Sequence, residues 1–292
     1  MTWEIIALLF LAGLSAGFID AIAGGGGLIT LPALLWAGLG PLEALATNKA
    51  QGVFGTAAAS ANFLRQGLID LRPAALAFSC AFVGAASGVL FVRHIGGDLP
   101  PWLIPALLIA FSLYFLISPR VSDLDARQRL SQSAFAFLVA LPIGFYDGFF
   151  GPGTGSFLAM GYVALLGYNL SRATAHAKLL NFASNLAALL FFIPSGHILW
   201  RYGLLMAAGQ FLGAWLGSHL VIRHGTRLIR PALVTASLAI SLKLLLDSAG
   251  GMTSRNSPQT TADFGQRGEP RVSERRVADL DAQPLAGRDL DA

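Results

Sequence analysis

Long apolar runs separated by short polar segments occupy the first 247 residues. A helix needs about 20 apolar residues to cross the hydrocarbon core of a bilayer. Two shorter runs, Leu28–Leu39 and Ser156–Leu166, are expected to be tilted or re-entrant. The pattern predicts an all-α polytopic membrane protein with about eight to ten membrane segments. The longer candidate spans are Trp3–Ala23, Leu42–Leu64, Pro73–Val92, Trp102–Ile117, Ala134–Phe150, Ala173–Pro194, Tyr202–Ile222 and Leu228–Leu246.

Composition agrees with lipid as the surrounding solvent. Hydrophobic residues make up 54% of the chain and charged residues 12%, about half the charged share of a soluble protein. The net charge of +4 does not indicate a nucleic-acid partner, because the arginines lie between apolar runs. The single cysteine, Cys80, rules out a disulfide framework or a cysteine-based metal site. Glu4 lies at the start of the first apolar run, where a signal peptide would be basic, so this run is expected to be a retained helix.

The chain contains an internal repeat. Gly17-Phe18-Ile19-Asp20 returns 127 residues later as Gly144-Phe145-Tyr146-Asp147, and Ala46-Thr47 returns as Ala173-Thr174. This offset places Lys49 opposite His176. After a two-residue slip, four further positions match, namely Gly67 with Gly196, Arg72 with Arg201, Gly84 with Gly213 and Gly88 with Gly217. Paired halves with interrupted short segments are typical of secondary transporters.

The arginines favour an inverted orientation of the second half. Cytoplasmic loops are enriched in Lys and Arg, and inversion leaves only Arg93 and Arg201 on the opposite face. It places one larger group together on the cytoplasmic side: Arg65, Arg72, Arg120, Arg127, Arg129, Arg172, Arg223, Arg227 and Arg230.

These observations divide the chain into four parts. We predict a first membrane repeat at 1–118, an inter-repeat loop at 119–132 and a second repeat at 133–247. The remaining segment, 248–292, is rich in polar residues and contains six Arg and seven acidic residues between 255 and 292. It has too little apolar area to offset its ordering entropy, so we predict a disordered tail.

Ionisable side chains within membrane segments are costly and therefore indicate function. Glu43 and Lys243 have simpler interpretations, as a helix cap and as an interfacial side chain. The others cluster around two glycine-rich helix breaks, Gly24–Gly27 and 151–155, whose freed backbone groups must line a cavity or be buried. A helix that starts after each break, at Leu28 or Ser156, offers N–H groups to an anion. The candidate proton carriers are Asp20 and Asp147.

A polar stripe is expected beside the second break. Lys178, Asn181 and Asn185 share one helical face, and Thr174 lies one turn before Lys178 on it. The stripe must face another helix or a wet cavity, and interhelical hydrogen bonding is the alternative to a binding site. The complete set of predicted substrate-binding residues is Thr47, Asn48, Lys49, Gln51, Gly24, Gly25, Gly26, Gly151, Gly153, Thr174, His176, Lys178, Asn181 and Asn185.

These motifs resemble the TauE/SafE family of sulfite-exporter-like permeases. The resemblance is carried by Gly17 to Gly27, then Pro32 and Thr47-Asn48-Lys49, and by the second-half motif that runs from Gly151 to Asn185; it covers about residues 4–247. It implies transport of small anions such as sulfite, sulfoacetate or other organosulfonates. Pro152 and His176 depart from the first-half pattern.

We therefore predict a secondary transporter of a small anion (sulfite, sulfonate or a related sulfur oxyanion), with proton coupling, in the inner membrane. Two alternatives stay open at this point: a non-transporting membrane scaffold or sensor, and an intramembrane hydrolase suggested by Tyr146-Asp147. The expected partners are a small anion and the lipid bilayer, with no nucleic acid. We expect no cofactor, no metal and no catalytic residues, and homo-oligomerisation is left open.

Overall fold

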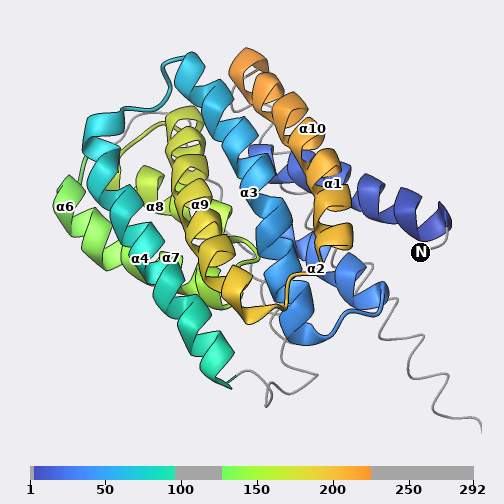
Figure 1. Ribbon diagram of the computed structural model, residues 1–292. Helices are drawn as coiled ribbons and strands as arrows, with labels where there is room; N and C mark the ends of the chain where they lie inside the picture. Colours follow the sequence, from blue (N-terminus) through green and yellow to red (C-terminus); the bar gives the residue numbers. More distant parts are fainter. Residues whose placement is uncertain (1–2, 96–126, 225–292) are drawn as a thin grey trace, which may run out of the picture. The chain divides into compact units, whose positions relative to one another are not determined.

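The computed structural model describes residues 3–95 and 127–224, and every regular element within these ranges is helical (Figure 1). The first half forms α1 (Trp3–Ala23), α2 (Gly27–Trp36), α3 (Pro41–Arg65) and α4 (Leu71–Ile95). The second half forms α6 (Gln132–Phe135), the π-helix η2 (Ala136–Ala140), α7 (Leu141–Phe149), α8 (Thr154–Leu166), α9 (Leu170–Phe192), the 3₁₀ turn η3 (Ile193–Ser195) and α10 (Trp200–His224). The predicted spans 102–117 and 228–246, and the tail, lie outside the described residues.

Glycine and proline determine where these helices end. Gly24, Gly151 and Gly153 have positive φ angles of 81°, 101° and 83°, which other residues adopt at a steric cost. Pro41 occupies the first turn of α3, where no N–H is needed. The predicted span Ala134–Phe150 is not one continuous α-helix, because a π-helical turn separates α6 from α7. The two short helices begin at Gly27 and Thr154, one and two residues earlier than expected.

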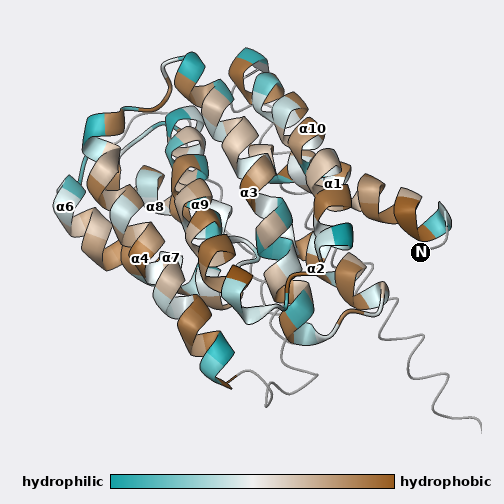
Figure 2. Ribbon diagram, viewed as in Figure 1, coloured by the Kyte–Doolittle hydropathy of each residue, from teal (hydrophilic) through white to brown (hydrophobic). Residues whose placement is uncertain are grey.

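Four of the described helices are long and apolar enough to cross a membrane: Trp3–Ala23, Leu71–Ile95, Leu170–Ser195 and Trp200–Arg223. Figure 2 shows hydrophobic residues along most of α1 and hydrophilic residues at the ends of α4. The helix α3 has 25 residues, enough for about 37 Å of rise, but it carries buried polar side chains at Thr47–Gln51. Such a helix crosses the membrane only where other helices surround it.

Glycines bring the two halves into close contact. On α1, a Cβ at Gly17 would lie 2.3 Å from the carbonyl oxygen of Gln210, and on α10 a Cβ at Gly213 would lie 2.0 Å from that of Leu14. The pair α4 and α7 meets in the same way, with Gly88 against Phe145. Small residues at i and i+4 let membrane helices approach closely. Thus α1 of the first half packs against α10, the last described helix of the second half, and α7 of the second half packs against α4, the last described helix of the first.

The contacts also give the helix directions. Gly13 and Gly17 of α1 meet Met206 and Gln210 in ascending order, so α1 and α10 run parallel. On α3, Gly55 meets Gln210 and Asn62 meets Ser218, so α3 runs parallel to α10 as well.

On the other side, Asp70, which directly precedes α4, and Phe78 and Arg93 of α4 meet His176, Phe182 and Phe191 of α9, again in ascending order. α7 is parallel to α4, because Gly84 meets Leu141 and Gly88 meets Phe145. The group α4, α7 and α9 is thus internally parallel, like the group α1, α3 and α10. Parallel directions within each group are compatible with a parallel or an inverted repeat, so the inverted repeat stays a prediction.

Cysteine labelling tests the orientation. In a Cys80→Ala background, Gln66→Cys, at the end of α3, is expected to react with a membrane-impermeant maleimide only from the cytoplasm. Pro194→Cys, at the end of α9, is expected to react only from outside, because the inverted halves place these ends on opposite faces. Both positions are exposed, and the Cys80→Ala protein is the control for background labelling. Labelling of both positions from the same side would contradict the inverted model.

The structure corrects the register of the repeat. Gly40 and Asn169 occupy the same position before α3 and α9, each with extended backbone (φ −63° and ψ 159° or 158°). Their offset is 129, so the two-residue slip lies before these helices rather than after them. Lys49 is therefore equivalent to Lys178 and Thr47 to His176. The predicted equivalence of Lys49 with His176 was wrong, because Ala46-Thr47 matched Ala173-Thr174 by composition and not by position.

Candidate functional site

Two buried ion pairs cross between the halves. Lys49 on α3 lies with its Nζ 2.5 Å from Oδ1 of Asp147 on α7, and Lys178 on α9 lies with its Nζ 2.9 Å from Oδ2 of Asp20 on α1. In the corrected register the two lysines are equivalent and the two aspartates are equivalent. Each lysine therefore pairs with the aspartate of the other half. Both lysines are at most 2% exposed, and a buried ammonium requires such a partner.

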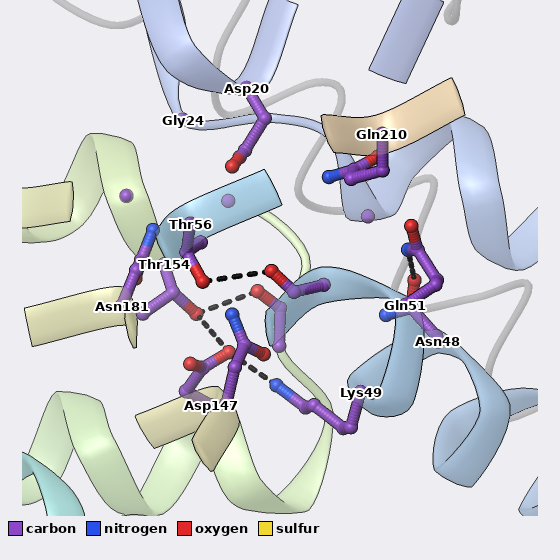
Figure 3. Close-up of a pocket in the computed structure, with 16 residues that line it drawn as sticks. Asp20, Gly24, Asn48, Lys49, Gln51, Thr56, Asp147, Thr154, Asn181 and Gln210 are labelled. Atoms are coloured by element: carbon purple, nitrogen blue, oxygen red, sulfur yellow. Dashed lines mark hydrogen bonds and ion pairs between the residues drawn. The ribbon is translucent and has the colours of Figure 1, made fainter. Parts of the chain in front are cut away.

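The pairs adjoin a cavity of about 40 Å³, enough for one or two water molecules or part of a small solute. Figure 3 shows Lys49 directed at Asp147, with Asn48, Gln51 and Gln210 on one side of the view and Thr154 and Asn181 on the other. The lining combines charges, amides, hydroxyls and bare backbone: Asp20, Gly24, Gly27, Asn48, Lys49, Gln51, Gly52, Thr56, Asp147, Gly151, Gly153, Thr154, Gly155, Asn181, Asn185 and Gln210.

Glycine is needed where the two helix breaks meet. A Cβ at Gly151 would lie 2.5 Å from Lys49 Nζ, and a Cβ at Gly155 would lie 2.9 Å from Lys178 Nζ and 2.7 Å from the Cα of Gly24. The hydroxyl of Ser156 donates to the carbonyl oxygen of Ala23 and joins the breaks. The backbone of the second break thus lies next to the ammonium groups of both lysines, and it also contacts the first break at Gly24.

Three amide side chains on the cavity wall have unused hydrogen-bonding capacity. The Oε1 atoms of Gln51 and Gln210 and the Oδ1 atom of Asn181 are buried and lack a hydrogen-bond partner among the described residues. An unpaired buried polar group is unfavourable, and an amide presents either an acceptor or two donors to a ligand. The cavity therefore provides both ammonium charge and amide groups to a small polar solute.

Many of the predicted site residues come together here. The cavity is lined by both predicted proton carriers, Asp20 and Asp147, and by eight of the fourteen predicted binding residues, namely Gly24, Asn48, Lys49, Gln51, Gly151, Gly153, Asn181 and Asn185. Lys178 reaches the cavity through its bond to Asp20. Gly25, Gly26 and Thr174 are outside the lining; the N–H of Gly26 donates to Asp20 Oδ1 at 3.1 Å, so this helix start is already occupied by a carboxylate.

Thr47 and His176 serve a different purpose from the predicted one. Oγ1 of Thr47 accepts the N–H of Leu199 at 3.0 Å, and Nε2 of His176 accepts the N–H of Asp70 at 3.2 Å. These are equivalent bonds in the two halves, and each holds the start of the segment that leads into the last described helix. Both side chains are next to the site in sequence but point to the ends of the bundle.

Sequence reasoning missed several residues of the lining. Gln210 on α10 was overlooked, although a lone amide in an apolar span is itself a signal of an interhelical or ligand contact. Thr154 lies within the second break, and its hydroxyl donates to Asp147 Oδ1 at 2.9 Å. The remaining members, Gly27, Gly52, Thr56 and Gly155, carry little polar signal of their own.

A bundle of interlocked halves around a charged cavity and two helix breaks is the architecture of a multi-pass membrane transporter. The model of the family described as sulfite exporter TauE/SafE matches residues 9–244. The chain belongs to the TauE/SafE family.

Curated relatives agree. The chain is 47% identical to the probable membrane transporter protein YfcA of Escherichia coli K12 over 246 residues, which cover 84% of this chain and 91% of that protein. It is 47% identical over 244 residues to a probable membrane transporter protein of Haemophilus influenzae (84% and 96%). It is 44% identical over 247 residues to the probable membrane transporter protein ORF9 of a Sinorhizobium species (85% and 95%). No solved structure matches significantly.

Proposed function

We propose that this protein is a proton-coupled secondary transporter of a small sulfur-containing anion, such as sulfite or a short sulfonate, in the inner membrane. The observation that carries the proposal is the pair of crossed Lys–Asp contacts at a small cavity between two helix breaks. Lys49 lines the cavity and Lys178 pairs with Asp20 of its lining, so a single oxyanion has two ammonium groups available when the pairs loosen.

The size and lining of the cavity limit the substrate. Its volume of about 40 Å³ suits a compact anion of few non-hydrogen atoms better than a long organic chain. Amide groups and hydroxyls replace part of the hydration shell that such an anion loses on entry. A buried anion must be paired and hydrogen-bonded, and this lining provides both kinds of contact.

Anion binding and flux test the proposal. Purified protein is expected to gain thermal stability with sulfite, sulfate, thiosulfate or methanesulfonate but not with chloride; a ligand at 100 times its Kd adds about 2.7 kcal/mol to the free energy of unfolding. Proteoliposomes are expected to accumulate the labelled binding anion when an inward proton gradient is imposed, whereas protein-free liposomes are the control. Stabilisation without flux would instead favour a sensor, and neither effect with any of these anions would contradict the proposal.

A further inference from the structure

The two ion pairs are equivalent in the repeat but differ in their surroundings. Asp147 receives three side-chain donors: Lys49, Thr154 and Ser184, with the hydroxyls of Thr154 and Ser184 bound to Oδ1 and Oδ2 respectively. Among the described residues, Asp20 receives only Lys178 and the backbone N–H of Gly26. The Asp147 side chain is 4% exposed and the Asp20 side chain 13%.

The sequence contains the cause of this difference. In the repeat register, Thr154 corresponds to Gly27 and Ser184 corresponds to Gly55. The first half therefore lacks both hydroxyls that bond to the aspartate in the second half. At Gly55 a side chain would not fit, because a Cβ there would lie 2.4 Å from Cγ of Gln210.

Adding a proton has different consequences at the two carboxylates. A proton on Asp147 would displace at least one of the three donors that now bond to this carboxylate. The displaced donor would be buried without an acceptor, which is costly. A proton on Oδ2 of Asp20 displaces only Lys178, while Oδ1 keeps its bond to Gly26. The freed ammonium lies beside Asp20 and Gly155, which line the cavity, and an anion there replaces the carboxylate as its partner.

Charge balance requires such a step. The charged groups that surround Asp20 on the described elements are Lys178 from α9, Lys49 from α3 and Asp147 from α7, whereas α2, α8 and α10 provide glycine, hydroxyl and amide groups. With Asp20 ionised, these four charges sum to zero. A monovalent anion entering alone would leave a net negative charge in a buried site, and one proton entering with it restores neutrality.

We infer that Asp20 is the proton-carrying residue and Asp147 a fixed counter-ion that positions Lys49. This inference rests on the proposed anion transport and adds an order of events. A proton from solution binds Asp20 Oδ2, Lys178 remains an ammonium and transfers from Asp20 to the anion, and on anion release Asp20 loses the proton and regains Lys178. One proton accompanies each monovalent anion.

Proton uptake measured on the full chain in detergent tests the inference. The probes are methanesulfonate, a monoanion, and sulfate, because neither changes its own protonation near neutral pH. Weakly buffered wild-type protein with an indicator dye is expected to take up one proton per methanesulfonate bound. If one proton is taken up with each anion, Kd should rise about tenfold per pH unit. The Asp20→Asn protein is expected to bind without proton uptake and with a Kd independent of pH.

Infrared difference spectroscopy identifies the carboxyl group. Anion binding to wild type is expected to produce the C=O band of a protonated carboxylic acid. This band should shift in Asp20→Glu, which keeps the charge and therefore the pairing with Lys178 in a folded protein. The matched variant Asp147→Glu should leave the band unchanged.

The outcomes separate the two proposals. A band that shifts in Asp147→Glu instead, or anion binding by wild type without proton uptake, would overturn the role of Asp20 alone. Absence of binding by sulfite, sulfate, thiosulfate and methanesulfonate alike would overturn the proposed function and this inference together.

Discussion

Lys49→Gln is expected to lower the free energy of unfolding by about 3–5 kcal/mol, the loss typical when one member of a buried ion pair is removed. Lys49 is 2% exposed, and its ammonium lies 2.5 Å from Asp147, so the variant leaves a buried carboxylate with two hydroxyl donors and no cation. Adding Asp147→Asn removes the unpaired charge and should recover most of the loss. Unfolding of the single and double variants in detergent measures the coupling.

A surface pair in the same protein provides the matched control. Arg172 and Asp70 also lie 2.5 Å apart, but their side chains are 39% and 51% exposed. Arg172→Gln is therefore expected to change stability by no more than about 1 kcal/mol. A Lys49→Gln protein as stable as wild type, or a double variant less stable than both single variants, would contradict the assigned pairing.

Gly213→Ala is expected to prevent normal assembly or to cost at least about 3 kcal/mol, at the upper end of overpacking effects. The added Cβ would lie 2.0 Å from the carbonyl oxygen of Leu14 and 2.8 Å from the nitrogen of Phe18. Backbone atoms cannot move aside as a flexible side chain does, so α1 and α10 must separate. The measurements are yield after extraction, monodispersity and melting temperature.

Gly203 on the same helix is the control. A Cβ there would lie 3.5 Å from Cγ2 of Thr47, an ordinary van der Waals contact. Gly203→Ala is therefore expected to fold normally and to gain slightly in helix propensity. Equal behaviour of the two alanine variants would show that the close approach of α1 and α10 does not depend on Gly213.

Much of the fold was predictable because hydrophobicity and helix breakers act locally. The run Trp3–Ala23 is identical to α1, and Leu42–Leu64 lies within α3. The π-helical turn at Ala136–Ala140 was not predictable, because its residues are ordinary apolar ones. It depends on packing against neighbouring helices, which the local pattern does not contain.

The residues of the site were easier to predict from the sequence than the ion pairs that they form. Intramembrane charge singled out Asp20, Lys49, Asp147 and Lys178, and all four meet at one place. Which lysine joins which aspartate depends on the spatial crossing of the halves, and a two-residue difference in length obscured their equivalence. Thr47 and His176 were included because they adjoin the motif, yet their direction on the helix takes them to the ends of the bundle.

The exchange of helices between the halves also affects how the protein is made. The glycine face of α1 can pack only after α10 has been synthesised, and the first residue of α10 is Trp200. Ribosomes add roughly 5–20 residues per second. For roughly ten to forty seconds, α1 therefore exists without its partner, held by lipid or by the insertion machinery. A chain truncated before α10 leaves α1 without its principal neighbour, so neither half is a self-sufficient unit. Biogenesis therefore includes a late step that joins α1 to α10, the last of the described helices.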